Sequence, residues 1–195
     1  MFVADAPRSL VLVGNEKRVR ETSHTATVAK QILPKLRYIS GIVNSSYGAG
    51  YLNWFKATNQ YNGELFWCPP SIKAMGVYLY TDARANYWNA PAGLNRGKIT
   101  DVYDLSFNPT DSEQDEIYTN TWNYAVNYPM NGIILEGQKT FQRDKTAFDR
   151  VNVRRLFLTL EKAVRRRSRY FVYENITDYM MTRFVDTMDP LFREA

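Results

Sequence analysis

The most regular alternation of hydrophobic and polar positions in this sequence lies between residues 152 and 169. Asn152 opens this stretch and is a suitable N-cap, because its side chain can accept hydrogen bonds from the amides of a first helical turn. A short apolar run at residues 170–173 follows and predicts a buried strand. The apolar positions recur at the three- and four-residue spacing of an amphipathic helix, and they are Val153, Leu156, Phe157, Leu160, Ala163 and Val164. We therefore expect one face of this helix to pack against a sheet.

The opposite side of the same predicted helix is strongly basic. At about 100° per residue, its cations fall on one arc that faces away from the apolar positions, and Leu158 lies inside that arc, where solvation alone would not place it. We call the following seven residues the basic face: Arg154, Arg155, Leu158, Lys162, Arg165, Arg166 and Arg169. A solvated helix surface is one interpretation. A contact surface is the other, because arginine forms bidentate bonds with carboxylate or phosphate groups and is enriched at interfaces.

Short apolar runs bounded by glycine or proline predict strands in the rest of the chain. Asn62-Gly63 joins two aromatic-rich runs, and this dipeptide is typical of a hairpin turn because both residues tolerate positive φ. The expected strands lie at residues 9–14, 38–43, 99–105 and 132–137, and the hairpin joins residues 47–55 to residues 65–67.

Helical spacing predicts four further helices. They begin near Thr25, at Ser71 (with Met75, Val77, Tyr78 and Leu79 buried), at Asp111, and at Thr177 or Asp178. Pro190 predicts a kink or restart in the last helix rather than its end. Strands that alternate with helices predict the α/β class, here a three-layer sandwich around a mixed sheet with an antiparallel hairpin, formed by a single domain over residues 1–195.

The amino-acid composition limits the classes of protein to which this chain can belong. The 195 residues suit one domain with a real core, and the net charge of +5 is concentrated in the basic helix, so the charge is a local patch. The only cysteine, Cys68, excludes an internal disulfide and fits a reducing compartment. No apolar run approaches the ~20 residues of a membrane span, and the first residues do not resemble a signal peptide. We expect a soluble intracellular protein.

The sequence offers little catalytic chemistry. Gly14 follows an apolar run, but the second and third glycines of a dinucleotide-binding loop are missing, and no Walker-type Gly-Lys-Ser/Thr is present. His24 and Cys68 are the only residues of their types, which excludes the usual Cys/His zinc sites. A Cys–His nucleophilic pair would require both of them. We predict no catalytic residue, no metal site and no cofactor.

A set of segments in a fixed order resembles a known family. The segments are Gly50–Phe55, Leu65–Ser71, Gly76–Asp82, Trp88–Gly97, Gly132–Thr140 and Phe148–Phe157. Together they are similar to the C-terminal half of the contractile tail sheath protein of myovirus-type bacteriophages, a module also found in contractile bacteriocin particles and related injection machines. The resemblance covers about residues 13–185, and its specificity lies in the order of the segments.

The resemblance implies a structural protein rather than an enzyme. Sheath subunits stack as helical rings around an inner tube, and their lattice contracts to drive the tube through the host envelope. The implied partners are other sheath subunits (a homo-oligomer) and the tail tube protein, with baseplate and tail terminator proteins as further candidates. No membrane or direct nucleic-acid contact is implied, and the implied location is the virion tail, assembled in the host cytoplasm.

Both ends of this sequence depart from the family pattern. Sheath subunits are linked by terminal arms that add strands to neighbouring sheets, and residues 1–195 carry no counterpart of these arms. We expect a fragment or a defective copy that does not form long contracted tubes by itself. The basic face would then contact the tube or a neighbouring subunit. From the residues alone, a basic α/β nucleic-acid-binding module remains the alternative.

Overall fold

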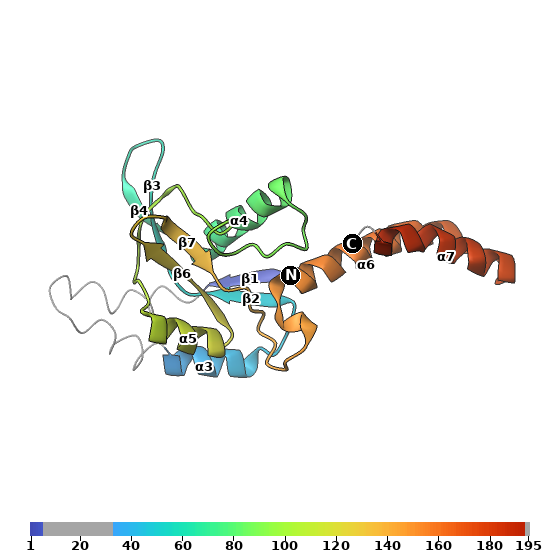
Figure 1. The fold of residues 1–195 in the computed structure, drawn as a ribbon, viewed down its shortest axis with the longest axis horizontal. Coiled ribbons are helices and arrows are strands. Elements are labelled where there is room, and N and C mark those ends of the chain that lie inside the picture. Colours follow the sequence, from blue (N-terminus) through green and yellow to red (C-terminus); the bar gives the residue numbers. More distant parts are fainter. Residues whose placement is uncertain (6–32, 194–195) are drawn as a thin grey trace.

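A computed structural model describes residues 1–5 and 33–193, which form a folded body and a pair of C-terminal helices that project from it (Figure 1). The body contains a mixed four-stranded sheet in the order β1-β2-β6-β7, in which β7 runs antiparallel to β6 and the other neighbours are parallel. Its strands are β1 (Phe2–Asp5), β2 (Gly48–Tyr51), β6 (Trp122–Tyr128) and β7 (Gly132–Glu136).

The predicted hairpin is present and belongs to a second sheet. This sheet is antiparallel with the order β4-β3-β5. Gly63 lies in the turn between the two hairpin strands with a φ of +73°, a conformation that glycine adopts without steric cost. The strands are β3 (Phe55–Thr58), β4 (Leu65–Cys68) and β5 (Val102–Leu105). The strand expected at residues 99–105 therefore begins three residues later than predicted.

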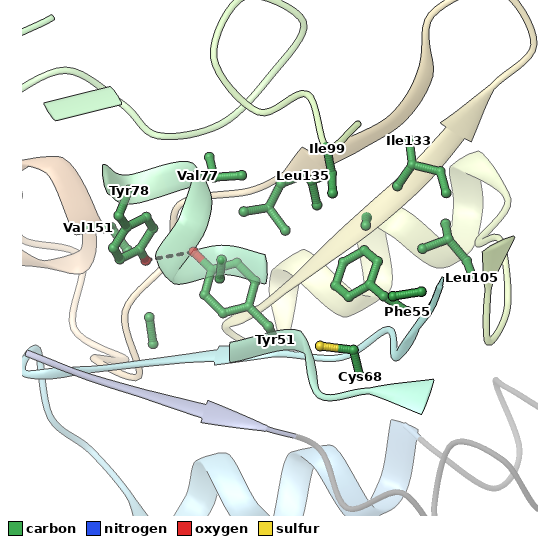
Figure 2. Packing of buried hydrophobic residues seen from close by; sticks show 14 residues of the cluster. Tyr51, Phe55, Cys68, Val77, Tyr78, Ile99, Leu105, Ile133, Leu135 and Val151 are labelled. Atoms are coloured by element: carbon green, nitrogen blue, oxygen red, sulfur yellow. Dashed lines mark hydrogen bonds between the residues drawn. The ribbon is translucent and has the colours of Figure 1, made fainter. Parts of the chain in front are cut away.

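Helices cover both faces of the mixed sheet (Figure 1). The helix α4 (Pro70–Arg84) lies on one face, and α3 (Leu33–Ile42) and α5 (Asp111–Thr119) lie on the other. Each face has its own apolar cluster. On the α4 side, Val77 and Tyr78 pack with Tyr51 of β2, as Figure 2 shows. The other cluster contains Ile117, Trp122 and Phe141, among others. The predicted α/β class is confirmed.

Two buried asparagines tie the strands of the mixed sheet together. Asn53 donates to the carbonyl oxygen of Phe107 (2.8 Å) and accepts from the amide of Ala125 (2.9 Å). Asn123 donates to the carbonyl oxygen of Gly50 (3.0 Å) and accepts from the amide of Lys139 (2.7 Å). Both side chains are at most 1% exposed. Because a buried amide without partners is costly, these bonds fix the register of the strands around them.

Several predicted elements differ in the structure. Residues 38–43, expected as a strand, lie mainly in α3, which begins at Leu33 and so places Pro34 in its first turn, where proline is tolerated. The first residue of α4 is Pro70, not Ser71, and Pro69 is its N-cap. Met75 and Leu79 of α4 are exposed rather than buried. The strand expected at residues 9–14 and the start of the helix near Thr25 lie outside the described residues.

The strand β6 was absent from the sequence prediction although it is central to the sheet. Its residues alternate only imperfectly, because the polar Asn123 lies buried among apolar neighbours. The helix expected to begin at Asp111 and the strand expected at residues 132–137 are confirmed. Thr110 and Glu113 form a capping box at the start of α5.

Candidate assembly surface

The basic helix leaves the body instead of packing along a sheet. It is α6 (Val151–Ser168), and only Val151 and Arg154 among its residues are buried. Its N-cap is Arg150, and the predicted cap Asn152 instead donates its side-chain amide to the carbonyl oxygen of Trp88 (3.2 Å). Figure 1 shows α6 leading away from both sheets. The expectation that its apolar face packs on a sheet is therefore wrong.

Arg154, the first cation of the basic face, points into the body. Its side chain is 8% exposed and donates a hydrogen bond to the hydroxyl of Ser46. The guanidinium lies 4.4 Å from the ring centroid of Tyr47 and 4.2 Å from that of Phe148. A guanidinium is weakly hydrated and stacks well on aromatic faces, so it tolerates this burial better than an ammonium would. Arg154 therefore joins the start of α6 to the body.

Arg155 makes a second link. It forms an ion pair with Asp82 near the end of α4, and its guanidinium lies 4.8 Å from the ring centroid of Tyr78. Val151, which is fully buried, adds an apolar contact within the main core cluster. Arg154 and Arg155 thus position the helix, and they are not part of the surface that α6 presents to solvent.

The remaining cations of the basic face lie on the part of α6 beyond the body. Lys162, Arg165, Arg166 and Arg169 are all exposed, and Leu158 is half-buried. Within residues 33–193, none of these four cations forms an ion pair. Three of them fall in or next to the last turn of the helix, where positive charge is stabilised by the helix dipole.

A second helix folds back along α6. The segment after α6 is a short 3₁₀ helix, η3 (Arg169–Phe171), and α7 (Asp178–Arg193) follows. Phe171 packs edge-to-face on Phe184 with ring centroids 5.2 Å apart, and Arg167 donates to the carbonyl oxygen of Thr187 (2.9 Å). These contacts make α6 and α7 antiparallel. We refer to residues 156–193 as the arm.

The arm corrects one predicted element and confirms another. Residues 170–173 are not a buried strand, since Tyr170 is 79% and Tyr173 101% exposed and Tyr173 has a φ of +73°. The last helix begins at Asp178, with Thr177 accepting a hydrogen bond from the amide of Met180 (3.2 Å). It continues through Pro190, as the spacing after that proline predicted.

The arm exposes an unusual amount of apolar surface. Only Met188 of α7 is buried. Met181, Val185 and Phe192 are 52%, 58% and 56% exposed and recur at spacings of four and seven, so they lie on one side of α7. We call these three residues the α7 stripe. The sequence predicted the helix that carries this stripe. The wide apolar arc of α7, too broad for one partner helix to cover, was the signal that could have revealed it.

No catalytic arrangement emerges from the described part of the chain. No group of three His, Cys, Asp or Glu side chains there could hold a metal ion, and no described helix is long and apolar enough to cross a membrane. The hydroxyls of Tyr51 and Tyr78 are 2.7 Å apart in the core (Figure 2). Burial raises the pKa of Tyr78 to about 12 and that of Tyr51 well above its usual value. These phenols remain protonated at neutral pH and serve to hold α4 on β2.

Comparison with curated sequences finds tail sheath proteins. No family model matches the sequence. The tail sheath protein of Vibrio phage KVP40 is 32% identical over 147 residues, which is 75% of this chain and 22% of that protein. The tail sheath protein of Enterobacteria phage T4 is 33% identical over 132 residues, 68% of this chain and 20% of that protein. The chain spans about a fifth of the length of these relatives.

Solved structures show the same fold in a larger chain. The sheath complex of an extracellular contractile injection system (PVC) in its contracted state superposes with a TM-score of 0.72. The match covers 83% of this chain and 44% of the chain in that complex, at 24% sequence identity. At that identity, the likeness shows a shared α/β fold.

Proposed function

We propose that this chain, which belongs to the family of bacteriophage tail sheath proteins and matches them over about three quarters of its length, is a structural subunit of a contractile tail sheath. Such a sheath polymerises around an inner tube and contracts to drive the tube through the host envelope. The observation that carries this assignment is the 32% identity with a phage tail sheath protein over 75% of the chain. The exposed apolar and cationic side chains of the arm supply a surface through which such a subunit could assemble. No described residue set argues for an enzymatic role.

The arm is the proposed assembly surface. A monomeric soluble protein rarely exposes a large contiguous apolar patch, and such patches mark interaction sites. The exposed large apolar side chains of the arm include those of both helices and of the segment between them: Phe157, Tyr170, Val172, Tyr173, Ile176, Tyr179, Met181, Val185 and Phe192. An arm of this composition is stabilised when another protein covers it.

The outer part of the basic face is the proposed electrostatic contact. Lys162, Arg165, Arg166 and Arg169, with Leu158 among them, face an acidic surface of the tail tube or of a neighbouring subunit. Exposed ion pairs contribute only ~0–1 kcal/mol each, but a ring of identical subunits repeats them many times. Arg154 and Arg155 act differently, because they set the direction in which the arm leaves the body.

The partners and location follow from the same assignment. Other sheath subunits and the tail tube are the principal partners, and baseplate and tail terminator proteins are the partners expected at the ends of the sheath. The location is the virion tail, assembled in the host cytoplasm. For the fold, we propose that the body forms one three-layer sandwich domain with the arm as its appendage, since apolar clusters lie on both faces of the mixed sheet. The comparisons lend no support to the nucleic-acid-binding alternative.

Sedimentation velocity over a concentration series tests the assignment. The chain should self-associate reversibly, and the double charge reversal Lys162→Glu/Arg166→Glu should weaken binding to sheath or tube without changing the thermal unfolding midpoint. A matched control is Arg143→Glu/Lys145→Glu, which reverses two exposed cations of the body. A chain that stays monomeric, binds no tail component and instead binds random duplex DNA in a salt-dependent manner would contradict the proposal.

A further inference from the structure

The body carries an apolar groove that no described part of the chain fills. It lies between α4 and residues 94–101 and has a volume of about 440 Å³. Three of its lining side chains are large, apolar and well exposed: Ile72 at 58%, Tyr80 at 45% and Leu94 at 60%. Val77 and Ile99 form its buried floor. We call this feature the α4 groove.

The rim of the α4 groove is basic on balance. Lys98 is exposed at the rim. Lys73 is also at the rim and pairs with Asp101, so that pair is neutral and Lys98 supplies the net charge. An occupant that fits this groove would therefore be apolar along one side and acidic along an adjoining edge.

The α7 stripe has these properties. At about 100° per residue, Met181, Val185 and Phe192 lie within roughly 40° of one another around α7. Two carboxylates, Asp178 and Asp189, lie roughly 60–80° to one side of Met181 on the same scale. Asp189 is paired with Arg193 four residues later. Asp178 at the first turn therefore adds negative charge to one edge of the stripe.

The arm that carries the stripe leads away from α4 of the same chain. Val151 is buried in the body, and Arg154 and Arg155 hold α6 on Ser46 and Asp82. These contacts direct the arm away from α4, as Figure 1 shows. The three side chains of the stripe are each more than half exposed, so a second molecule can reach them.

We propose that the α7 stripe of one copy docks in the α4 groove of a second copy. An amphipathic helix laid into an apolar groove is a recurring recognition mode, and its anchors here are Met181, Val185 and Phe192. Because the two surfaces differ, the contact is heterologous. A heterologous contact generates a ring if its rotation closes and an open helical filament if it does not. This contact deepens the proposed function and rests on it, since it requires that copies of the chain assemble.

Cysteine cross-linking between two variants tests the contact directly. Cys68 is 3% exposed, so an engineered surface cysteine is the reactive thiol. Chains with Ile72→Cys and chains with Val185→Cys are mixed and treated with a short bismaleimide. The matched control replaces Val185→Cys by Val172→Cys, because both valines lie in the arm and are similarly exposed, at 58% and 55%. We expect a covalent heterodimer from the first mixture and little from the control.

The double variant Ile72→Cys/Val185→Cys distinguishes docking between two copies from docking of the arm on its own body. It should give a ladder of multimers whose yield rises with protein concentration. A cross-link formed within single chains at a concentration-independent rate would mean that the arm docks on its own body and would overturn the inference. Equal yields from the Val185 and Val172 variants would overturn it as well.

The outcomes also distinguish this contact from the proposed function. Val185→Asp should lower self-association in sedimentation velocity, while circular dichroism melting stays unchanged because the side chain is exposed. If the chain self-associates and binds tail components but the Ile72–Val185 cross-link is absent, the sheath assignment is supported and the proposed contact is ruled out. If the chain does not self-associate at all, both the sheath assignment and the proposed contact are contradicted.

Discussion

The body and the arm use apolar side chains in opposite ways. In the body, Trp122 and Phe141 are at most 2% exposed and pack edge-to-face with ring centroids 5.3 Å apart. In the arm, Phe192 and Tyr179 are more than half exposed although they belong to a regular helix. Helical spacing therefore specified the elements of the arm but not what covers them. The difference indicates that the core of the body is closed within one chain and that the arm requires a partner.

Truncating a core aromatic in the body should have the largest effect. Trp122→Ala removes a fully buried indole, and large-to-small changes of this kind cost about 3–5 kcal/mol. The arm counterpart Phe192→Ala should change stability by less than about 0.5 kcal/mol, because its side chain is mostly solvated already. Urea unfolding followed by fluorescence measures both. Equal losses for the two variants would contradict the contrast between a closed body and an uncovered arm.

Two glycine-to-alanine substitutions test how closely the side chains of the body are packed. A Cβ added at Gly50 would lie 2.6 Å from the ring of Phe141, so Gly50→Ala should cost about 1–3 kcal/mol by overpacking. Gly76 in α4 has no atom within 4 Å of such a Cβ, and Gly76→Ala should be neutral or stabilise by up to ~1 kcal/mol through helix propensity. The urea midpoints of the two variants should move in different directions. A stable Gly50→Ala variant would show that this part of the body can rearrange.

Alkaline pH should weaken the body through its buried phenols. Burial raises the pKa of Tyr78 to about 12, and that of Tyr51 is raised as well. A group with a raised folded pKa contributes stability that is present below its unfolded pKa and lost as pH rises through the folded pKa. The loss should begin above pH ~10 and reach about 1 kcal/mol for Tyr78 near pH 11, and Tyr51 adds to it in the same direction. Tyr78→Phe should flatten the decline in the urea midpoint between these values, and an unchanged slope would contradict the assignment.

The contact that joins the two helices of the arm should have the smallest effect on global stability. The pair of Phe171 and Phe184 is edge-to-face, an arrangement that adds about 0.5–1.5 kcal/mol. Phe184→Ala should leave the urea midpoint of the body nearly unchanged and speed amide exchange in α7, because local opening of the arm does not unfold the sheets. If the substitution instead unfolds the body in the same transition, the arm is part of the cooperative core.

Elements with a strong local signal were predictable from the sequence. The hairpin turn at Asn62-Gly63 and the start of α5 at Asp111 each depend on neighbouring residues, so sequence alone located them. Residues 38–43 and 170–173 were placed wrongly, since a short apolar run does not distinguish a strand from a helical segment. The strand β6 was missed because its buried Asn123 obtains its partners from Gly50 and Lys139, which are distant in sequence.

The basic face was also predictable only in part, because the contacts that decide its role join residues distant in the sequence. The spacing of the basic face placed Arg154 and Arg155 with the other cations of α6. Their partners Ser46 and Asp82 are 108 and 73 positions away, so nothing local indicates that these two arginines hold the helix to the body. The direction of α6, and with it the exposure of the α7 stripe, follows from those tertiary contacts.

Hydrogen exchange followed by mass spectrometry tests most directly whether the arm is completed by another copy. Peptides from α7 and from β6–β7 are compared in the chain at a concentration where it is monomeric and in the self-associated chain. We predict that exchange in α7 slows strongly on association, that exchange in α4 slows with it, and that exchange in β6–β7 does not change. Equal protection of α7 in the monomer and in the assembly would contradict the central claim.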